Sequence, residues 1–283
     1  MRLRRLLPLA LIAALLVLPA AAAGWQEAPH SRARLIAAGT ANADALAGRT
    51  HLRTPAQLVG LEIELDPGWK TYWRSPGDGI PPQFEWAGSD NVAAAQVLWP
   101  VPTHFRDAAG EYNGYADRVV LPVVVAPKRP GAPVSLDLAL DYAVCKDVCI
   151  PVSAQLSLRL PDDTPRGRQA VLEALRQVPV RADSRGRCGD LALADARLRF
   201  DGPSPRMEIT LTHPPGGAPE DLFVEAATGQ FMPHPKRQEA TAERTVFHLD
   251  PSAGGDPREL AGKAMTLTVV AAPQSCEMTA TME

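Results

Sequence analysis

Two runs of alternating apolar residues flank a pair of cysteines near the middle of this chain, and they constrain its fold more than any other feature. The first run ends at Cys145, the second begins at Cys149, and only Lys146-Asp147-Val148 lies between them. A three-residue hairpin loop there would pair every apolar residue with another apolar residue, as a fixed antiparallel register requires. The expected pairs are Val144 with Ile150, Tyr142 with Val152, Leu140 with Ala154, Leu138 with Leu156, and Leu136 with Leu158.

The same register places Cys145 opposite Cys149 on the more polar face of the hairpin. Directly opposed residues of antiparallel strands have Cα atoms about 4.5 to 5.5 Å apart, which is within the range of a disulfide. Pro151 has no backbone N–H to donate to a neighbouring strand, so we expect its strand to lie at a sheet edge or to be bulged there. Cys149 would then be accessible to a sulfur of another protein.

Short alternating runs bounded by Pro, Gly and Asp recur through the rest of the chain, which contains 28 prolines in 283 residues. This pattern predicts an all-β architecture of sandwich type. One segment differs, because its apolar residues recur at helical spacing. Thr164 can cap this helix, Pro165 suits its first position, and Pro179 ends it. We interpret the helix as a connector between two β domains.

The N-terminus has the pattern of a secretory signal peptide. Arg2, Arg4 and Arg5 precede an apolar stretch at 6–18, and small residues at 21–23 offer a cleavage site. The alanine-rich site suits a bacterial periplasmic protein, and disulfides persist in that oxidising compartment. About 260 residues would remain after cleavage, which is enough for two domains. The formal charge of -3, with both signs interspersed, indicates no nucleic-acid partner.

We therefore expect four parts. They are a signal peptide at 1–23, a first β-sandwich domain with the cysteine pair at 24–161, a helical connector at 162–183, and a second β-sandwich domain at 184–283.

The two cysteine pairs predict different roles. In the chain-entropy model, a bond between Cys145 and Cys149 closes five residues and stabilises by only about 2 kcal/mol. A bond between Cys188 and Cys276 would close nearly ninety residues and stabilise by about 4.6 kcal/mol. The long bond is therefore expected to be structural, and the short, exposed one to be redox-active. An inert hairpin staple and a metal site remain alternatives for the short pair.

Three segments resemble the periplasmic N-terminal domain of the DsbD family of thiol:disulfide interchange proteins, and most closely its ScsB-like branch. They are "GWKTYWRSPGDGIPPQFEW" at 68–86, "YADRVVLPVVV" at 115–125 and "DYAVCKDVCIP" at 141–151. The resemblance implies an immunoglobulin-like fold and a thiol–disulfide oxidoreductase of the protein-disulfide reductase type. It implies Cys149 as the exchanging sulfur, Cys145 as the resolving one, and no cofactor. A membrane electron-transfer protein would be the donor, and periplasmic thioredoxin-like oxidoreductases would be the acceptors.

The chain departs from the family pattern in two ways. It ends at Glu283 without the membrane domain and thioredoxin-like domain of full members, so either electrons would come from a separate protein or the chain has a role other than a relay. Aromatic residues of a cap loop shield the cysteines in better-known members, but Ala108-Ala109-Gly110 occupies that place here. Phe105, Tyr112 and Tyr115 are the candidates to shield the pair instead.

Two other function classes are compatible with the sequence. The first is a copper-handling module that binds Cu(I) through Cys145 and Cys149, together with Cys276 or the methionines Met278 and Met282. For the last three residues, a strand end or frayed tail is the alternative interpretation. The second class is a non-enzymatic adaptor whose sandwiches dock partners.

Several other aromatic residues and histidines are assigned structural or surface positions. Core or inter-sheet packing is favoured over a ligand surface for Trp69, Tyr72 and Trp73. Three histidines have no metal-ligand spacing and are expected at the surface: His213, His234 and His248.

Overall fold

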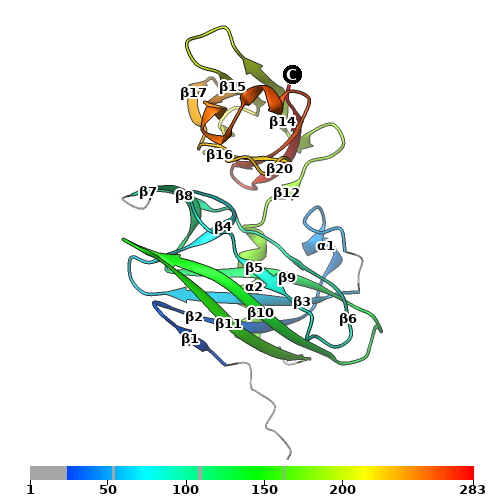
Figure 1. Ribbon diagram of the computed structural model, residues 1–283. Coiled ribbons are helices and arrows are strands. Elements are labelled where there is room, and N and C mark those ends of the chain that lie inside the picture. The colour runs from blue at the N-terminus through cyan, green and yellow to red at the C-terminus, as the bar shows by residue number, and fades with distance from the viewer. Residues whose placement is uncertain (1–23, 53–54, 108–109, 162) are drawn as a thin grey trace, which may run out of the picture.

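The computed structural model describes residues 24–52, 55–107, 110–161 and 163–283 (Figure 1). The predicted signal peptide at 1–23 lies outside these residues. Strands dominate and form four sheets, two in each of two stacked sandwiches, which confirms the all-β prediction. Within the described part of the chain, no helix is long and apolar enough to cross a membrane.

The first sandwich consists of two antiparallel sheets, with helix α1 (Ala43–Leu46) in the connection after the second strand. One sheet has the order β1 (Gln26–Ala28), β2 (Ser31–Thr40), β3 (Gln57–Leu65), β9 (Arg118–Pro127), β6 (Val92–Val97). The other has the order β11 (Cys149–Leu160), β10 (Val134–Cys145), β4 (Lys70–Gly77), β8 (Gly110–Ala116), β7 (Thr103–Asp107), and β5 (Gln83–Glu85) also pairs with β10.

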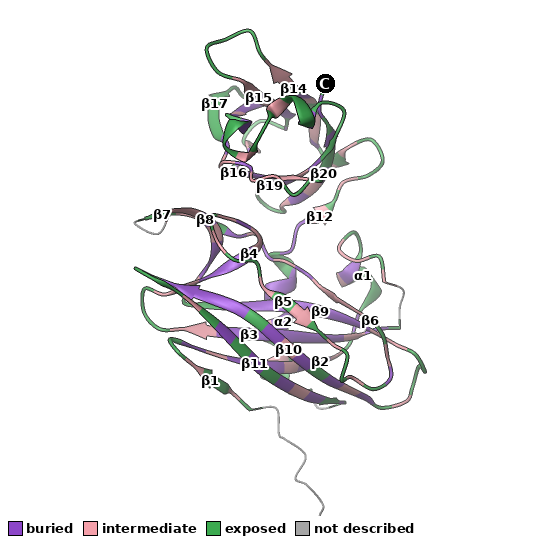
Figure 2. Ribbon diagram, viewed as in Figure 1, coloured by how far each residue is buried: buried purple, intermediate pink, exposed green. Residues whose placement is uncertain are grey.

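The β10–β11 hairpin has the register that the sequence predicts. Pairing runs from Val134 opposite Leu160 to Cys145 opposite Cys149, and every predicted apolar pair is present. Buried residues alternate with more exposed ones along β11 and along β10 as far as Tyr142, so one face of the hairpin packs into the core between the two sheets (Figure 2). The last four residues of β10, Tyr142 to Cys145, are all buried. Among the strands that the structure describes, β11 pairs only with β10, which confirms the edge position expected from Pro151.

Helix α2 (Pro165–Arg176) does more than join the two sandwiches. Its N-cap Thr164 accepts a hydrogen bond through Oγ1 from the backbone N–H of Gly167 at 3.1 Å, as the sequence predicts. Val171 is buried against the outer face of the sheet formed by β2, β3 and β9. Gly60 of β3 makes this approach possible, because a Cβ there would lie 2.7 Å from Cγ2 of Val171. The helix thus adds a third layer to the first domain.

The second sandwich also consists of two sheets, with two short 3₁₀ helices, η1 (Pro251–Gly254) and η2 (Pro257–Leu260). One sheet has the order β12 (Val180–Arg181), β20 (Cys276–Thr281), β19 (Ala264–Val270), β16 (Asp221–Ala226). The other has the order β13 (Arg187–Cys188), β14 (Leu191–Arg199), β15 (Arg206–Thr212), β18 (Arg244–Leu249), β17 (Lys236–Ala240).

A disulfide between Cys188 and Cys276, with Cα atoms 6.2 Å apart, joins the two sheets of the second sandwich. Cys276, Met278 and Met282 are all buried in the core of this domain. Of the two structural interpretations, the strand end is therefore correct and the frayed tail is wrong, because Cys276–Thr281 is a packed core strand. The suggested copper ligand set is also not assembled, because Cys276 is bonded to Cys188 and not grouped with Cys145 and Cys149.

Strand β4 supplies two of the side chains that join the two domains. Trp73 packs in the first core against Phe223 of β16, with ring centroids 5.6 Å apart. Arg74 donates hydrogen bonds to Glu225 at 2.7 to 3.2 Å and to Glu277 at 2.7 Å. The same strand carries Tyr72 toward the cysteine pair, so it connects the domain boundary with the hairpin.

One expected surface histidine is buried. His213 is only 4% exposed, and its Nε2 lies 2.9 Å from Oγ1 of the buried Thr245. The surface prediction for His213 is therefore wrong, because a local sequence pattern does not show that the end of β15 pairs closely with β18. His234 and His248 are partly exposed.

Candidate functional site

Cys145 and Cys149 form a disulfide across the mouth of the β10–β11 hairpin, with Cα atoms 4.2 Å apart. Cys145 is completely buried, whereas Cys149 is exposed. The sequence-based expectation of an exposed pair is thus correct for Cys149 and wrong for Cys145. A reactant from solvent can reach only one of the two sulfur atoms.

The sheet order explains this difference in burial. β11 is an edge strand, and Cys149 begins it directly after the exposed loop at 146–148. β10 has a second neighbour, because Val144 and Cys145 pair with Thr71 and Lys70 of β4. Cys145 therefore lies between two strands and beneath side chains of β4 and β8.

Tyr72 is the side chain in closest polar contact with the disulfide. Its hydroxyl oxygen lies 2.8 Å from Sγ of Cys145 and 3.1 Å from Sγ of Cys149. The ring is only 3% exposed, and Gly79 leaves room for it, because a Cβ there would lie 2.3 Å from the ring. Burial raises the pKa of Tyr72, and the nearby carboxylates of Asp107 and Asp78 raise it further. The hydroxyl consequently keeps its proton and can donate it in a hydrogen bond to sulfur.

The β7–β8 hairpin covers this site with aromatic rings. Tyr112 packs edge-on against Tyr72 with centroids 5.4 Å apart, and Phe105 lies 5.6 Å from Tyr112. Phe105 and Tyr112 therefore take the shielding position that the sequence left open among three aromatics. The third, Tyr115, lies in the main core and donates a hydrogen bond to the backbone oxygen of Pro100 at 2.8 Å. Ala108 and Ala109 fall outside the described residues.

A carboxylate and an ammonium group hold the aromatic cover in place. Asp107 accepts hydrogen bonds through Oδ2 from the Tyr112 hydroxyl at 2.6 Å and from Lys70 Nζ at 2.8 Å. Burial, reinforced by the bond to Asp107, raises the pKa of Tyr112 to about 12. The hydrogen bond from Lys70 to Asp107 raises the pKa of Lys70. The Tyr112 phenol and the Lys70 ammonium therefore keep their protons at neutral pH.

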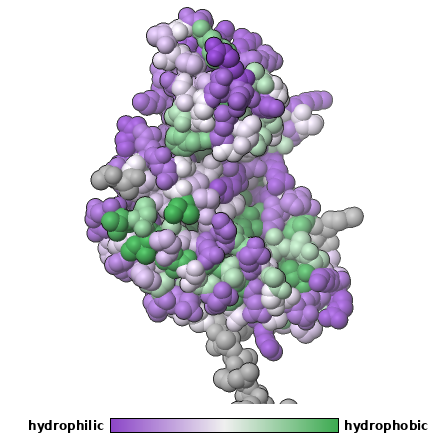
Figure 3. All heavy atoms as spheres, in the orientation of Figure 1, coloured by the Kyte–Doolittle hydropathy of each residue, from purple (hydrophilic) through white to green (hydrophobic). Residues whose placement is uncertain are grey.

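Exposed apolar side chains are found next to Cys149. Val148, in the hairpin loop, is 61% exposed, and Ile80, one residue after the glycine that packs on Tyr72, is 49% exposed. The space-filling view shows apolar residues gathered at the left edge of the first domain, over the end of the β10–β11 hairpin (Figure 3). Such a rim is typical of a surface that contacts another protein.

Sequence reasoning identified the two cysteines but missed Tyr72 as a site residue. Tyr72 was assigned to packing, and its ring does pack in a small buried cluster with Tyr112 and Cys145. No local signal distinguishes its hydroxyl from that of any other strand tyrosine. Across the described ranges, no group of three or more His, Cys, Asp or Glu side chains is arranged to hold a metal ion.

The fold and the site together define a thiol–disulfide exchange module. A β-sandwich presents one accessible sulfur, and the buried partner sulfur has a hydroxyl donor in place. Residues 42–161 match the family model described as "Thiol:disulfide interchange protein DsbD, N-terminal". This part of the chain is therefore a DsbD N-terminal domain, as the three resembling segments predict.

A solved structure supports the fold over nearly the whole chain. The N-terminal periplasmic domain of ScsB from Proteus mirabilis superposes with a TM-score of 0.68 at 24% sequence identity. The match covers 92% of this chain and 97% of that one. No curated protein matches the sequence significantly.

Proposed function

We propose that this protein relays electrons by dithiol–disulfide exchange at Cys145 and Cys149, as a thiol–disulfide oxidoreductase of the protein-disulfide reductase type. The observation that carries the proposal is the unequal burial of the two bonded sulfurs beneath Tyr72. A membrane electron-transfer protein would supply the electrons, and periplasmic thioredoxin-like oxidoreductases would accept them. The match to the DsbD N-terminal family supports these partner classes.

The proposed location is the periplasm, after removal of a signal peptide at 1–23. The mature chain would then comprise the redox domain at 24–161, the connector at 162–183 and a second domain at 184–283. In the second domain, the bond between Cys188 and Cys276 closes a long loop between two sheets, so we assign it a structural role.

Reduction of the module begins at Cys149, because only this sulfur is accessible. A donor thiolate attacks Sγ of Cys149, the disulfide breaks, and its electron pair moves to Sγ of Cys145. Tyr72 donates a hydrogen bond to the thiolate that forms there. The second donor thiol then attacks its own sulfur in the mixed disulfide and releases Cys149. The donor leaves as a disulfide, and the module has gained two electrons and, from solvent, two protons.

Delivery of the electrons follows the reverse sequence. The Cys149 thiolate attacks the acceptor's disulfide and forms a mixed disulfide, and one acceptor sulfur leaves as a thiolate. Cys145 then attacks Sγ of Cys149, which restores the intramolecular disulfide and releases the reduced acceptor. Cys145 needs no access to solvent for this step, because its only reaction partner is the neighbouring Cys149.

Single cysteine variants test these roles. Cys145→Ser removes the resolving thiol, so Cys149 should accumulate mixed disulfides with thioredoxin-like proteins. Cys149→Ser leaves only the buried thiol and should trap far less. The matched variants each lose the same short bond, which contributes about 2 kcal/mol, so both should remain folded. Non-reducing gels followed by mass spectrometry of the trapped proteins provide the measurement.

Each alternative outcome has a defined meaning. Equal trapping by both variants would show that burial does not select the reacting sulfur. No trapping by either variant, with the fold intact by circular dichroism, would falsify the exchange function and leave the staple or the metal site as the role of the pair.

A further inference from the structure

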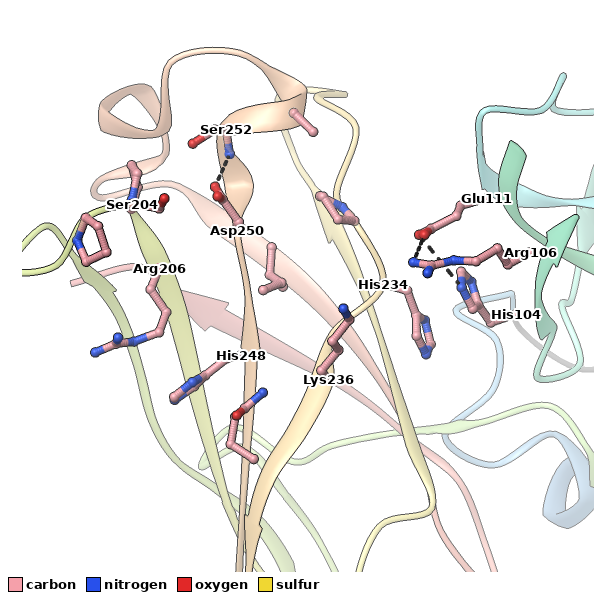
Figure 4. Close-up of a pocket in the computed structure, with 16 residues that line it drawn as sticks. His104, Arg106, Glu111, Ser204, Arg206, His234, Lys236, His248, Asp250 and Ser252 are labelled. Atoms are coloured by element: carbon pink, nitrogen blue, oxygen red, sulfur yellow. Dashed lines mark hydrogen bonds and ion pairs between the residues drawn. The ribbon is translucent and has the colours of Figure 1, made fainter. Parts of the chain in front are cut away.

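A groove of about 800 Å³ lies where the two domains meet, beside the β7–β8 hairpin (Figure 4). His104, Arg106 and Glu111 line it from the hairpin, and the remaining lining residues come from the second domain. Its volume is in the range of sites that take a small organic ligand. The stacked rings of His104 and His234, with centroids 3.8 Å apart, connect the two walls.

The lining of this groove contains more cationic than anionic side chains. Arg106, Arg206 and Lys236 contribute three permanent positive charges, and the only carboxylates are Glu111 and Asp250. Both carboxylates already have partners within the protein, because Glu111 pairs with Arg106 and Asp250 accepts a hydrogen bond from the backbone N–H of Ser252 at 2.9 Å. Figure 4 shows these two interactions at opposite ends of the groove.

Several nitrogen atoms of the groove have no firm partner. The nearest carboxylate to Arg206 is that of Asp201 at 3.9 Å, and Nε of Arg206 is buried without a hydrogen-bond partner. Nδ1 of His234 is buried and unpartnered as well. Among the described residues, Lys236 makes no side-chain hydrogen bond or ion pair. Because these two buried atoms have no surface open to the groove, a ligand there would meet the exposed Lys236 side chain and the partly exposed guanidinium of Arg206 instead.

Part of the remaining lining is apolar and rigid. Pro203, Pro205 and Pro233, together with Leu249 and Ala253, provide surface without polar side chains. Proline loses little conformational freedom when a ligand binds, because its ring already fixes the backbone. The groove thus combines an apolar wall with two cations, Lys236 and Arg206, that have no close carboxylate partner.

We infer that this groove binds an organic anion with an apolar body, through Lys236 and Arg206 on the second domain. The apolar part would lie against the proline wall, and the acidic group would lie between the cations. This site is separate from the exchange chemistry of Cys145 and Cys149, and its test requires no redox activity.

A pair of dyes with the same ring system provides the probe. 8-Anilinonaphthalene-1-sulfonate is an anion with an apolar body, and N-phenyl-1-naphthylamine is the same body without the sulfonate. Titration of the oxidised full chain with each dye, followed by fluorescence, should show one site for the anion and at least tenfold weaker binding of the neutral dye.

Charge-removing variants then locate the site. Lys236→Gln should weaken the anionic dye about threefold, and the double variant Lys236→Gln/Arg206→Gln about tenfold, as expected for partly exposed ion pairs. The matched control is Lys263→Gln, an exposed lysine of the same domain that is outside the groove, and it should bind like the parent protein. Neither single lysine variant removes a packing contact in a core.

Histidine resonances provide an independent location. The chain has six histidines, and three of them line the groove: His104, His234 and His248. In NMR spectra, the anionic dye should shift the imidazole C–H signals of these three residues and leave those of His30, His51 and His213 in place. Any one of four results would overturn the inference. They are equal affinity of Lys236→Gln and Lys263→Gln for the anionic dye, equal affinity of the protein for the two dyes, absence of binding, and shifts confined to the other three histidines.

Discussion

Replacing Tyr72 with Phe removes a single oxygen atom from the redox site. That oxygen lies 2.8 Å from Sγ of Cys145, the sulfur that leaves as a thiolate during reduction. The ring would keep its edge-on packing against Tyr112. Because phenylalanine fills the same space, the variant should fold, and its stability should change by no more than about 1 kcal/mol.

The size of the kinetic effect follows from the hydrogen bond. A hydrogen bond to a charged group contributes about 2 kcal/mol, and the developing thiolate carries about half of its charge in the transition state. The variant should therefore lose about 1 kcal/mol of transition-state stabilisation, which corresponds to about fivefold slower reduction. The equilibrium should shift toward the disulfide, because the reduced form with a Cys145 thiolate loses the donor.

Stopped-flow reduction by dithiothreitol, with thiols counted by mass spectrometry, measures the rate. Tyr115→Phe is the matched control, because it removes a buried hydroxyl of the same domain that bonds to the backbone oxygen of Pro100 and not to sulfur. Its reduction rate should equal that of the parent protein. If Tyr72→Phe is reduced as fast as Tyr115→Phe, the hydroxyl contributes nothing to the leaving sulfur, and the reasoning fails.

Three further predictions concern the whole chain. In glutathione and dithiothreitol buffers, the hairpin disulfide should equilibrate at about -120 to -270 mV and the long disulfide of the second domain below about -300 mV; equal potentials would remove the distinction between them. Burial raises the pKa of all four tyrosines, with Tyr112 at about 12, so the phenolate absorbance at 295 nm should appear at higher pH in the folded than in the unfolded chain. Because the folded state favours the neutral phenols, their contribution to stability should be lost as pH rises from 10 toward 12. Phenolate absorbance that appears at the same pH in the folded and the unfolded chain would contradict this. Arg74→Met should destabilise the contact between the domains by about 3 kcal/mol in denaturant unfolding, because Glu225 and Glu277 lose their shared partner, whereas Arg166→Met on the exposed start of α2 should have little effect.

The sequence by itself determined the elements whose information is local. The alternation on both sides of a three-residue loop allows only one apolar register, so the pairing of Cys145 with Cys149 follows from the pattern alone. Pro151 indicates the edge strand because it lacks an N–H, and Thr164 followed by Pro165 marks the start of α2 because both satisfy the needs of a helix N-terminus.

Only the tertiary structure decided which sulfur is accessible. Cys145 is buried because β4 pairs with β10, and this contact brings the Tyr72 hydroxyl to a sulfur 73 residues away in the sequence. The burial of His213 and the core position of Cys276 have the same origin, since each depends on neighbouring strands that are distant in the sequence. Period-two alternation specifies which face of a strand is buried but not which strands become neighbours, so the surroundings of a side chain emerge only when the sheets assemble.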